Sequence, residues 1–329
     1  MIQQQAQFVG RQGSLFIEAR LDKETAELAH GCTVACLFVN DLCDGEVVDK
    51  LAQGGVKVIA MRCAGYDRVD LAACQRHGIR VVRVPAYSPR SVAEHAFALA
   101  FALARELRSQ TQRVSAGNYT LSGIVGMELS FKTYGVVGTG NIGIEMIKLL
   151  RCLDGRVLCY DPYPSEEAKA LGVQYVPLEE LLQESDLITL HCPLFQETFH
   201  LMNEERFALL KPNTILVNVS RGGLVDTNAL ITALEDGKLG GVAMDVYENE
   251  GNLFDADFTE LTTKARMKLW DKRFAYLKSL PQVIITPHSA FLTREALKNI
   301  ADTTVQNVLE AVAGGPLTNE VKPRRPSLS

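Results

Sequence analysis

The sequence predicts an α/β protein with two domains, each built on a doubly wound parallel sheet. The chain has 329 residues, which two domains of about 150 residues would account for. From residue 14 onward, short apolar runs rich in Val, Ile and Leu alternate with helical patterns. Runs without polar alternation are typical of strands that helices bury on both faces. Their alternation with helices favours parallel βαβ units.

The expected elements follow one another along the whole chain. The strands are expected at 15–18, 34–39, 56–61, 80–84, 134–137, 157–160, 187–191, 215–219, 241–244 and 283–286. The longest early helix is expected at 92–108, where Ser91 and Glu94 have the spacing of a capping box. Asp226 and Thr293 stand where the N-caps of two later helices are expected.

Composition and charge exclude several classes of protein. Hydrophobic residues make up 47% of the chain and charged residues 22%, which is the balance of a folded protein and not of a disordered one. No apolar run approaches the ~18 residues of a membrane span, so no membrane partner is expected. The net charge of −5 gives no basic footprint, so no nucleic-acid partner is expected either.

The eight cysteines are spread along the chain and form no C-x-x-C pair. Disulfide scaffolds are short and dense in cysteine, so we expect free thiols that pack as small hydrophobic residues. No metal site is expected, because the histidines stand apart from the cysteines except at His191-Cys192. These features favour the cytoplasm or another reducing compartment.

A glycine-rich turn predicts dinucleotide binding. Gly138, Gly140 and Gly143 form G-x-G-x-x-G between an expected strand and an amphipathic helix that starts at Asn141 and Ile142. The first glycine permits a tight turn, the second lets a pyrophosphate approach the backbone, and the third lets helix and strand pack closely. The helix N-terminus adds N–H groups and a positive dipole for the phosphates. The pattern alone is weak, and its place between strand and helix strengthens it.

Asp161 ends the next expected strand, 18 residues after Gly143. A carboxylate there accepts hydrogen bonds from ribose hydroxyls and repels a 2′-phosphate. Pro162 and Tyr163 follow, and no arginine is present to receive such a phosphate. We therefore expect NAD rather than NADP. The alternative is that Asp161 is only a turn residue before proline.

Three later strand ends carry side chains suited to chemistry at a carbonyl group. Arg221 follows one expected strand and His288 follows the last, and between them an acidic loop holds Asp245, Glu248 and Glu250. Arginine suits a substrate carboxylate, and an imidazolium gives a proton to a carbonyl oxygen near neutral pH. A glutamate bonded to the far ring nitrogen would favour the charged imidazole. Composition alone does not show whether Glu248 or Glu250 would bind the histidine. It also leaves open that Arg221 is a surface residue, that the acidic loop is only solvated and that His288 is structural.

In this order, the motifs resemble those of the D-isomer-specific 2-hydroxyacid dehydrogenase family over about residues 14–322. The stretches that carry the resemblance are 138–143, 160–162, 220–222, 245–250 and 286–288. Within the family, the fermentative D-lactate dehydrogenases are the closest likeness, through 62–66, 84–89, 191–194 and 288–293. The resemblance implies an NAD-dependent enzyme that reduces pyruvate to D-lactate.

The resemblance also assigns roles to residues. Arg221, Glu250 and His288 would be catalytic, which selects Glu250 over Glu248. The substrate carboxylate would meet backbone N–H groups, and two aromatic rings would line the pocket unless they serve core or hinge packing. These four substrate residues would be Ala64, Gly65, Tyr87 and Phe291. The nicotinamide side of the site would be lined by Cys192, Pro193, Val219 and Asp245, and by Thr198.

The family pattern divides the chain into a Rossmann NAD-binding domain at 93–291 and a flavodoxin-like substrate domain at 1–92 and 292–329. It also implies a homodimer or higher homo-oligomer, through a long helix that is apolar on more than one face. Two alternatives stay open. One is a dehydrogenase for another 2-hydroxy acid such as glycerate or hydroxypyruvate, and the other is an NAD-sensing binding protein like the corepressors of this superfamily. The charged segment 252–280 is longer than in bacterial lactate enzymes and leaves substrate breadth open.

The first 13 residues contain five glutamines and no strand period. They also lack the basic and apolar regions of a secretory signal. Because the relatives open with a strand and a helix, we expect either a sheet without its first strand or a sequence that begins inside a longer natural chain. In the second case an upstream targeting segment is possible, so an organellar location stays open.

Overall fold

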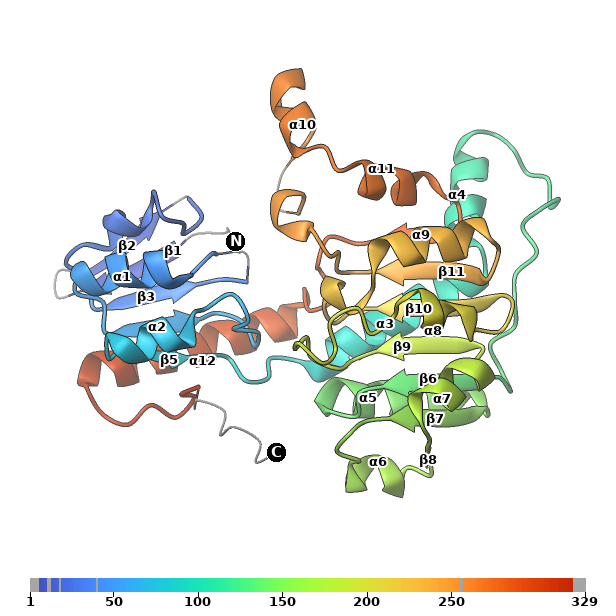
Figure 1. Ribbon diagram of the computed structural model, residues 1–329, viewed down its shortest axis with the longest axis horizontal. Coiled ribbons are helices and arrows are strands. Elements are labelled where there is room, and N and C mark those ends of the chain that lie inside the picture. Colours follow the sequence, from blue (N-terminus) through green and yellow to red (C-terminus); the bar gives the residue numbers. More distant parts are fainter. Residues whose placement is uncertain (1–5, 11–12, 18, 40, 255–256, 322–329) are drawn as a thin grey trace. The chain divides into compact units, whose positions relative to one another are not determined.

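The computed structural model describes residues 6–10, 13–17, 19–39, 41–254 and 257–321. The chain divides into two compact units (Figure 1). Unit 1 comprises Met1–Ser88 with Thr293–Ser329, and unit 2 comprises Pro89–Leu292. Each unit has its own sheet. The predicted α/β class with parallel sheets is confirmed.

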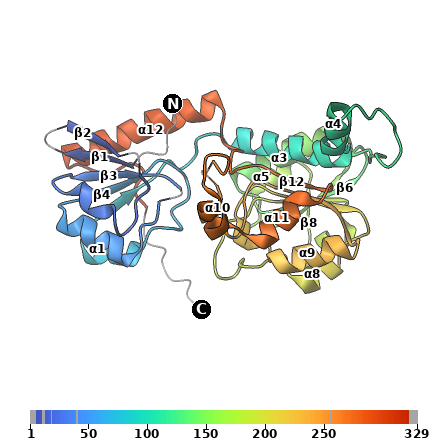
Figure 2. The same cartoon turned by 90° about the horizontal axis from the view of Figure 1, so that it is seen from above.

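Unit 1 contains a five-stranded sheet in the order β2-β1-β3-β4-β5. The strands are β1 (Ala6–Gly10), β2 (Gly13–Ile17), β3 (Val34–Leu37), β4 (Val58–Met61) and β5 (Arg80–Val82). The helices are η1 (Ala26–Ala29), α1 (Gly45–Gln53), α2 (Leu71–Arg76) and α12 (Arg294–Ala313). The parallel strands β3, β4 and β5 are covered by α1 and α2 on one face and by α12 on the other (Figure 2).

The start of the chain differs from the prediction. The sequence predicts no strand before residue 14, and a sheet without its first strand is one of the two explanations given for this. In the structure, β1 pairs antiparallel with both β2 and β3. Gly13, at the turn between β1 and β2, has a φ of 115°, which side-chain-bearing residues rarely adopt. The strand β1 is only five residues long, and backbone hydrogen bonds to β2 and β3 hold it in the sheet. A strand this short leaves little periodic pattern in the sequence.

Unit 2 contains a seven-stranded, all-parallel sheet in the order β12-β11-β10-β9-β6-β7-β8. The strands are β6 (Thr133–Val137), β7 (Arg156–Tyr160), β8 (Gln174–Tyr175), β9 (Leu187–Leu190), β10 (Thr214–Asn218), β11 (Leu239–Met244) and β12 (Val283–Ile285). The α-helices are α3 (Pro89–Ala104), α4 (Leu107–Ser115), α5 (Asn141–Leu150), α6 (Glu166–Ala170), α7 (Leu178–Glu184), α8 (Glu204–Ala208), α9 (Thr227–Glu235), α10 (Thr263–Leu269) and α11 (Lys272–Ser279). Three short 3₁₀ helices are η2 (Arg151–Leu153), η3 (Gly222–Leu224) and η4 (Glu250–Asn252).

The strand order of unit 2 creates a switch point beside β6. From β6 the chain first adds β7 and β8 on one side, and then returns to add β9, β10, β11 and β12 on the other. Open α/β sheets bind ligands beyond the carboxyl ends of the strands at such a point. All strands run in the same direction, so the loops after β6, β9, β10, β11 and β12 lie at that one edge.

The helix α3 begins earlier and ends earlier than the sequence predicts. Its first residue is Pro89, whose fixed φ suits the first helical position. Ser91 is therefore buried inside the helix and is not a cap. The carboxylate of Glu94 instead accepts a hydrogen bond from Arg90 at 3.0 Å. The predicted capping box is wrong, because the proline already fixes the start of the helix.

The two predicted helix caps and the prediction of free cysteines are confirmed. The side chains of Asp226 and Thr293 cap α9 and α12 by accepting backbone N–H groups. Gly314, with a φ of 71°, ends α12 as a left-handed C-cap. All eight cysteines are free thiols. Among the described residues, no helix combines the length and the apolar character needed to cross a membrane.

Candidate active site

The glycine-rich turn lies between β6 and α5, and its three glycines meet three different surroundings. Gly138 has a φ of 95°, and a Cβ atom there would lie 2.5 Å from the backbone nitrogen of Cys192. A Cβ atom on Gly143 would lie 2.0 Å from the carbonyl oxygen of Gly138. Gly140, at the N-cap of α5, faces open space, with no atom within 4 Å of such a Cβ. This is the space that a pyrophosphate would need at a helix N-terminus, so the turn fits a dinucleotide.

Asp161 lies directly after β7 and turns its carboxylate back to the glycine-rich turn. Its Oδ2 atom accepts hydrogen bonds from the Thr139 backbone N–H at 2.7 Å and hydroxyl at 3.1 Å. Its Oδ1 atom accepts the Tyr163 N–H at 2.8 Å, so Asp161 is a turn residue as well. The Tyr175 hydroxyl, on β8, donates to the Thr139 hydroxyl at 2.8 Å. A carboxylate offers about four acceptor positions, so one is left for a ribose hydroxyl.

Arg221 is placed by the loop that follows β10. The Asn218 side-chain amide donates to the Arg221 carbonyl at 2.9 Å, and the Arg221 guanidinium donates to the Ser220 carbonyl at 2.8 Å. A Cβ atom on Gly222 would lie 2.0 Å from the carbonyl carbon of Tyr247. Only glycine therefore fits between this loop and the loop after β11.

His288 and Glu250 form a pair. The Nδ1 atom of His288 lies 3.1 Å from Oε1 of Glu250, and the two side chains are 17% and 10% exposed. The other carboxylate oxygen of Glu250 accepts the backbone N–H of Tyr247 at 3.1 Å. An ionised carboxylate can only accept hydrogen bonds, so we assign a proton to Nδ1 of His288. The Nε2 atom is then the one available to exchange a proton with a substrate.

Glu248, two residues earlier, has different partners. One of its carboxylate oxygens lies 2.7 Å from Nε2 of His200, and the other accepts the Thr227 hydroxyl at 2.7 Å. Burial raises the pKa of Glu248, but the hydrogen bonds from Thr227 and His200 outweigh it and hold the pKa below its usual value. The ambiguity between the two glutamates is thus removed: Glu250 faces His288, and Glu248 links two loops.

Asp245 is completely buried and holds the loop that carries His288. Its carboxylate accepts the N–H groups of Ser289 and Ala290, each at 2.8 Å. Its backbone carbonyl accepts the N–H of His288 at 2.8 Å. The side chain that the resemblance places on the nicotinamide side therefore also fixes the backbone on which His288 stands.

The remaining predicted residues of unit 2 lie around the same edge. Cys192 follows β9. Burial raises the pKa of its thiol to about 12, so the side chain is uncharged at neutral pH. Thr198 closes the next turn by donating its hydroxyl to the Pro193 carbonyl at 2.7 Å. Val219 is buried at the end of β10. Phe291 lies half-buried next to the last residue of the unit.

The other predicted substrate residues belong to unit 1. The Ala64 carbonyl accepts a hydrogen bond from the Arg83 guanidinium at 2.9 Å, and the Gly65 carbonyl accepts the Cys63 thiol at 3.2 Å. Both carbonyl oxygens are thus engaged by side chains of the same unit. Within the part of the chain that the structure describes, the Ala64 and Gly65 N–H groups have no hydrogen-bond acceptor. Two adjacent N–H groups of this kind suit a carboxylate. Tyr87 lies half-buried near the end of the first segment of the unit.

Sequence reasoning missed three side chains that support this site. Tyr175 holds Thr139, and His200 holds Glu248. His95, on α3, reaches the loop of His288 and lies 3.6 Å from Asp245. No local motif marks any of the three, because each acts on a residue that only the fold brings near.

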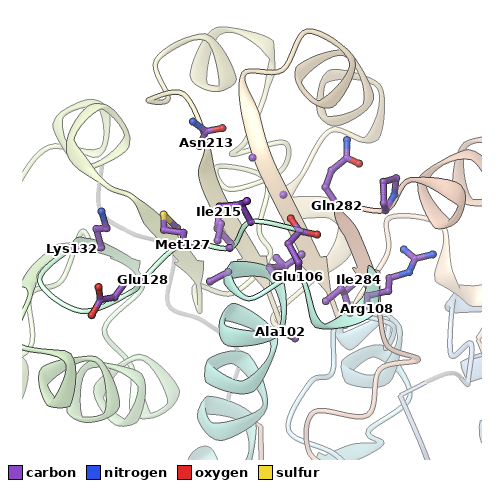
Figure 3. Close-up of a pocket in the computed structure, with 17 residues that line it drawn as sticks. Ala102, Glu106, Arg108, Met127, Glu128, Lys132, Asn213, Ile215, Gln282 and Ile284 are labelled. Atoms are coloured by element: carbon purple, nitrogen blue, oxygen red, sulfur yellow. The ribbon is translucent and has the colours of Figure 1, made fainter. Parts of the chain in front are cut away.

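A cavity of about 480 Å³ lies at the opposite edge of the sheet in unit 2 (Figure 3). It is lined by the amino ends of β10, β11 and β12, by the end of α3 and by residues 125–128. The Arg108 guanidinium beside it already donates to the carbonyls of Lys278 and Leu280, at 2.7 and 2.8 Å. Because the strands end at the other edge, this cavity is separate from the candidate active site.

The fold and the site define a class of protein. A phosphate-binding turn at the switch point of a parallel sheet takes a dinucleotide. An imidazole bound to a carboxylate, on the same sheet edge as an arginine, serves proton transfer at a carbonyl group. Both belong to the oxidoreductases that use a nicotinamide cofactor.

Comparison with known proteins agrees with this class. A model of the "D-isomer specific 2-hydroxyacid dehydrogenase, NAD binding domain" matches residues 97–290. The D-lactate dehydrogenase of Escherichia coli is 44% identical over 93% of this chain and 91% of its own length. The chain therefore belongs to the D-isomer-specific 2-hydroxyacid dehydrogenase family, and it is an oxidoreductase with an NAD-binding domain.

Solved structures show the same relationship. The pyruvate reductase of Chlamydomonas reinhardtii is 54% identical, with a TM-score of 0.86 over 92% of this chain and 90% of that one. The D-lactate dehydrogenase of Aquifex aeolicus, in complex with NAD and lactic acid, is 36% identical, with a TM-score of 0.81 over 92% and 90%.

Proposed function

We propose that this enzyme reduces pyruvate to D-lactate with NADH, and that the reaction is reversible. The observation that carries the proposal is the 3.1 Å pair of His288 and Glu250 at the carboxyl edge of a dinucleotide-binding sheet. It is supported by relatives of similar length that bear the names D-lactate dehydrogenase and pyruvate reductase.

His288 is the proton donor of the reduction. The carboxylate of Glu250 holds the Nδ1 proton, which leaves Nε2–H of the imidazolium directed to the carbonyl oxygen of the substrate. In lactate oxidation the neutral imidazole takes the proton of the hydroxyl group. Each direction therefore needs a different protonation state of the same ring.

Arg221 binds the 2-oxo acid and polarises its carbonyl group. Its planar guanidinium offers two parallel donors to a carboxylate. Electrostatic stabilisation of the developing oxyanion usually contributes more to the rate of such reactions than any other effect. The N–H groups of Ala64 and Gly65 are the second contact for the substrate carboxylate, and Tyr87 and Phe291 limit the room for its side chain.

We propose NAD as the preferred cofactor over NADP. When bound, the dinucleotide supplies or accepts the hydride. The Asp161 carboxylate stands where a 2′-phosphate would need a positive partner. Gly138, Gly140 and Gly143 shape the turn for the pyrophosphate, and the N-terminus of α5 at Asn141 and Ile142 supplies N–H groups.

A steady-state assay tests the function. We would measure NADH and NADPH oxidation with pyruvate, hydroxypyruvate, glyoxylate and phenylpyruvate, for wild type, His288→Gln and Arg221→Lys. We expect the highest kcat/KM for pyruvate with NADH, and losses of about a hundredfold or more in both variants. A preference for hydroxypyruvate would assign the enzyme to another 2-hydroxy acid. No turnover, combined with tight NADH binding, would favour a dinucleotide-sensing protein.

We further propose that the enzyme is a homo-oligomer assembled through unit 2. Between α3 and β6, large apolar side chains are exposed by 46% to 89%. They are Leu107, Val114, Tyr119, Leu121, Val125 and Phe131. They belong to one stretch of the chain, and Val125 also lines the cavity of Figure 3, which favours cover by a second copy of the chain. Light scattering on wild type and on Leu121→Asp would test this, because a monomeric wild type would refute it.

A further inference from the structure

The loop that carries His288 is wrapped around one carboxylate. Besides the N–H groups of Ser289 and Ala290, the Asp245 carboxylate accepts the hydroxyl of Thr286. These residues stand on both sides of His288 in the chain. The Asp245 carboxylate therefore holds the whole segment from Thr286 to Ala290, which carries the His288 ring; we call it the anchor of this segment.

This segment needs an anchor, because the backbone of His288 is strained. Its φ is 54°, in the left-handed region that a residue with a side chain rarely occupies. A strained conformation persists only where its surroundings hold it. Here the backbone carbonyl and the carboxylate of Asp245 supply that hold.

A histidine from another element completes the anchor. The Nε2 atom of His95, on α3, lies 3.1 Å from the Thr286 hydroxyl oxygen and 3.6 Å from Oδ1 of Asp245. The Thr286 hydroxyl donates its only proton to the carboxylate, so it must accept from His95. The Nε2 atom of His95 therefore carries a proton. The two hydrogen bonds therefore run in one direction, with His95 donating to Thr286 and Thr286 donating to Asp245.

We propose that His95 is a positioning residue for His288, acting through the Thr286 hydroxyl and the Asp245 carboxylate. It does not touch the substrate. It polarises the hydroxyl that binds the anchor, and hydrogen bonds in such chains strengthen one another. The consequence is a His288 ring that stays at the right distance from Glu250.

The charged groups around this loop are few among the described residues. Asp245 and Glu250 are the carboxylates that contact it. Two cations, Arg108 and Lys278, line a cavity beside Thr286 and Pro287, and Arg108 is engaged by backbone carbonyls. His95 is thus the group that can place a donor on Thr286.

Two variants of His95 test the proposal. His95→Phe keeps a ring of similar size and removes the donor, whereas His95→Gln keeps an N–H donor near the position of Nε2. The activity readout rests on the proposed function. For His95→Phe we expect kcat with pyruvate to fall about tenfold, with an unchanged KM. His95→Gln should restore most of the lost kcat.

A second readout does not depend on turnover. The chain has six histidines, so the ring signals of His288 can be assigned by NMR with the His288→Gln variant. We expect displaced His288 ring signals in His95→Phe, and wild-type ring signals in His95→Gln. Unchanged His288 signals in a folded His95→Phe protein would overturn the proposal, as would equal damage by both variants. A wild type that fails to turn over pyruvate refutes the proposed function alone, since the NMR signals still report on His95.

Discussion

His191 makes the stability of unit 2 depend on pH. It follows β9, and both of its ring nitrogens are buried without a hydrogen-bond partner among the residues that the structure describes. Burial lowers the pKa of this imidazole to about 4. In the unfolded chain a histidine titrates near ~6.5. Below that pH the histidine of the unfolded chain is protonated while that of the folded chain stays neutral. The free energy of unfolding therefore falls as the pH falls from about 6.5 to about 4.

The size of the effect follows from the two values. One pKa unit corresponds to about 1.4 kcal/mol. At pH 5 the unfolded histidine is almost fully charged and the folded one is neutral, which corresponds to a loss of about 2 kcal/mol relative to pH 7.5. His191→Gln keeps a polar side chain of similar size that does not titrate. This variant should lose about 2 kcal/mol less than wild type between the two pH values.

Urea unfolding at pH 7.5 and pH 5.0 measures this difference. Trp270, the only tryptophan, lies in unit 2 and reports on that unit by fluorescence, with circular dichroism as a second probe. His30→Gln, at an exposed position of unit 1, is the matched control and should retain the wild-type pH dependence. If His191→Gln and wild type lose the same free energy between the two pH values, the buried imidazole is not neutral and the reasoning is refuted.

Three further predictions concern the active site. Glu250→Gln should lower kcat for pyruvate about tenfold or more in a steady-state assay, because His288 loses the carboxylate that holds its Nδ1 proton. Asp161→Ala should weaken NADH binding about tenfold or more and NADPH binding less, as measured by fluorescence titration. Iodoacetamide at pH 7.5 should alkylate the exposed Cys152 and spare Cys192, whose pKa burial raises to about 12; peptide mass spectrometry would locate the label.

Each of these predictions has a result that contradicts it. A kcat that Glu250→Gln leaves unchanged, but that Glu248→Gln lowers, would reverse the assignment of the two glutamates. An equal loss of NADH and NADPH affinity in Asp161→Ala would mean that the carboxylate only supports Thr139. Rapid labelling of Cys192 would show that its thiol is not enclosed as the structure has it.

Sequence reasoning succeeded where the requirement is local. The glycines at 138, 140 and 143 follow from the backbone geometry of one turn, and their surroundings agree with that geometry. The caps at Asp226 and Thr293 are equally local. Both kinds of signal act over a few residues, so a single sequence contains them.

It failed where the decisive partner is distant in the chain. Glu248 and Glu250 are two residues apart in one acidic loop, and only tertiary structure turns one to His200 and the other to His288. His95 lies 191 residues from Thr286, the residue it contacts. The hairpin strand β1 escaped notice for another reason, since backbone pairing needs no apolar period.

The contacts of Gly138 and Gly222 have a consequence for how such an enzyme can acquire a new substrate. Each glycine lets two strand-end loops of unit 2 touch backbone to backbone, Gly138 against Cys192 and Gly222 against Tyr247. Loops fitted this closely leave no room for insertions or larger residues, so mutation has little freedom there. We expect evolutionary changes of substrate preference to arise through substitution of Tyr87 in unit 1. The side chain can vary there without disturbing the pair of His288 and Glu250.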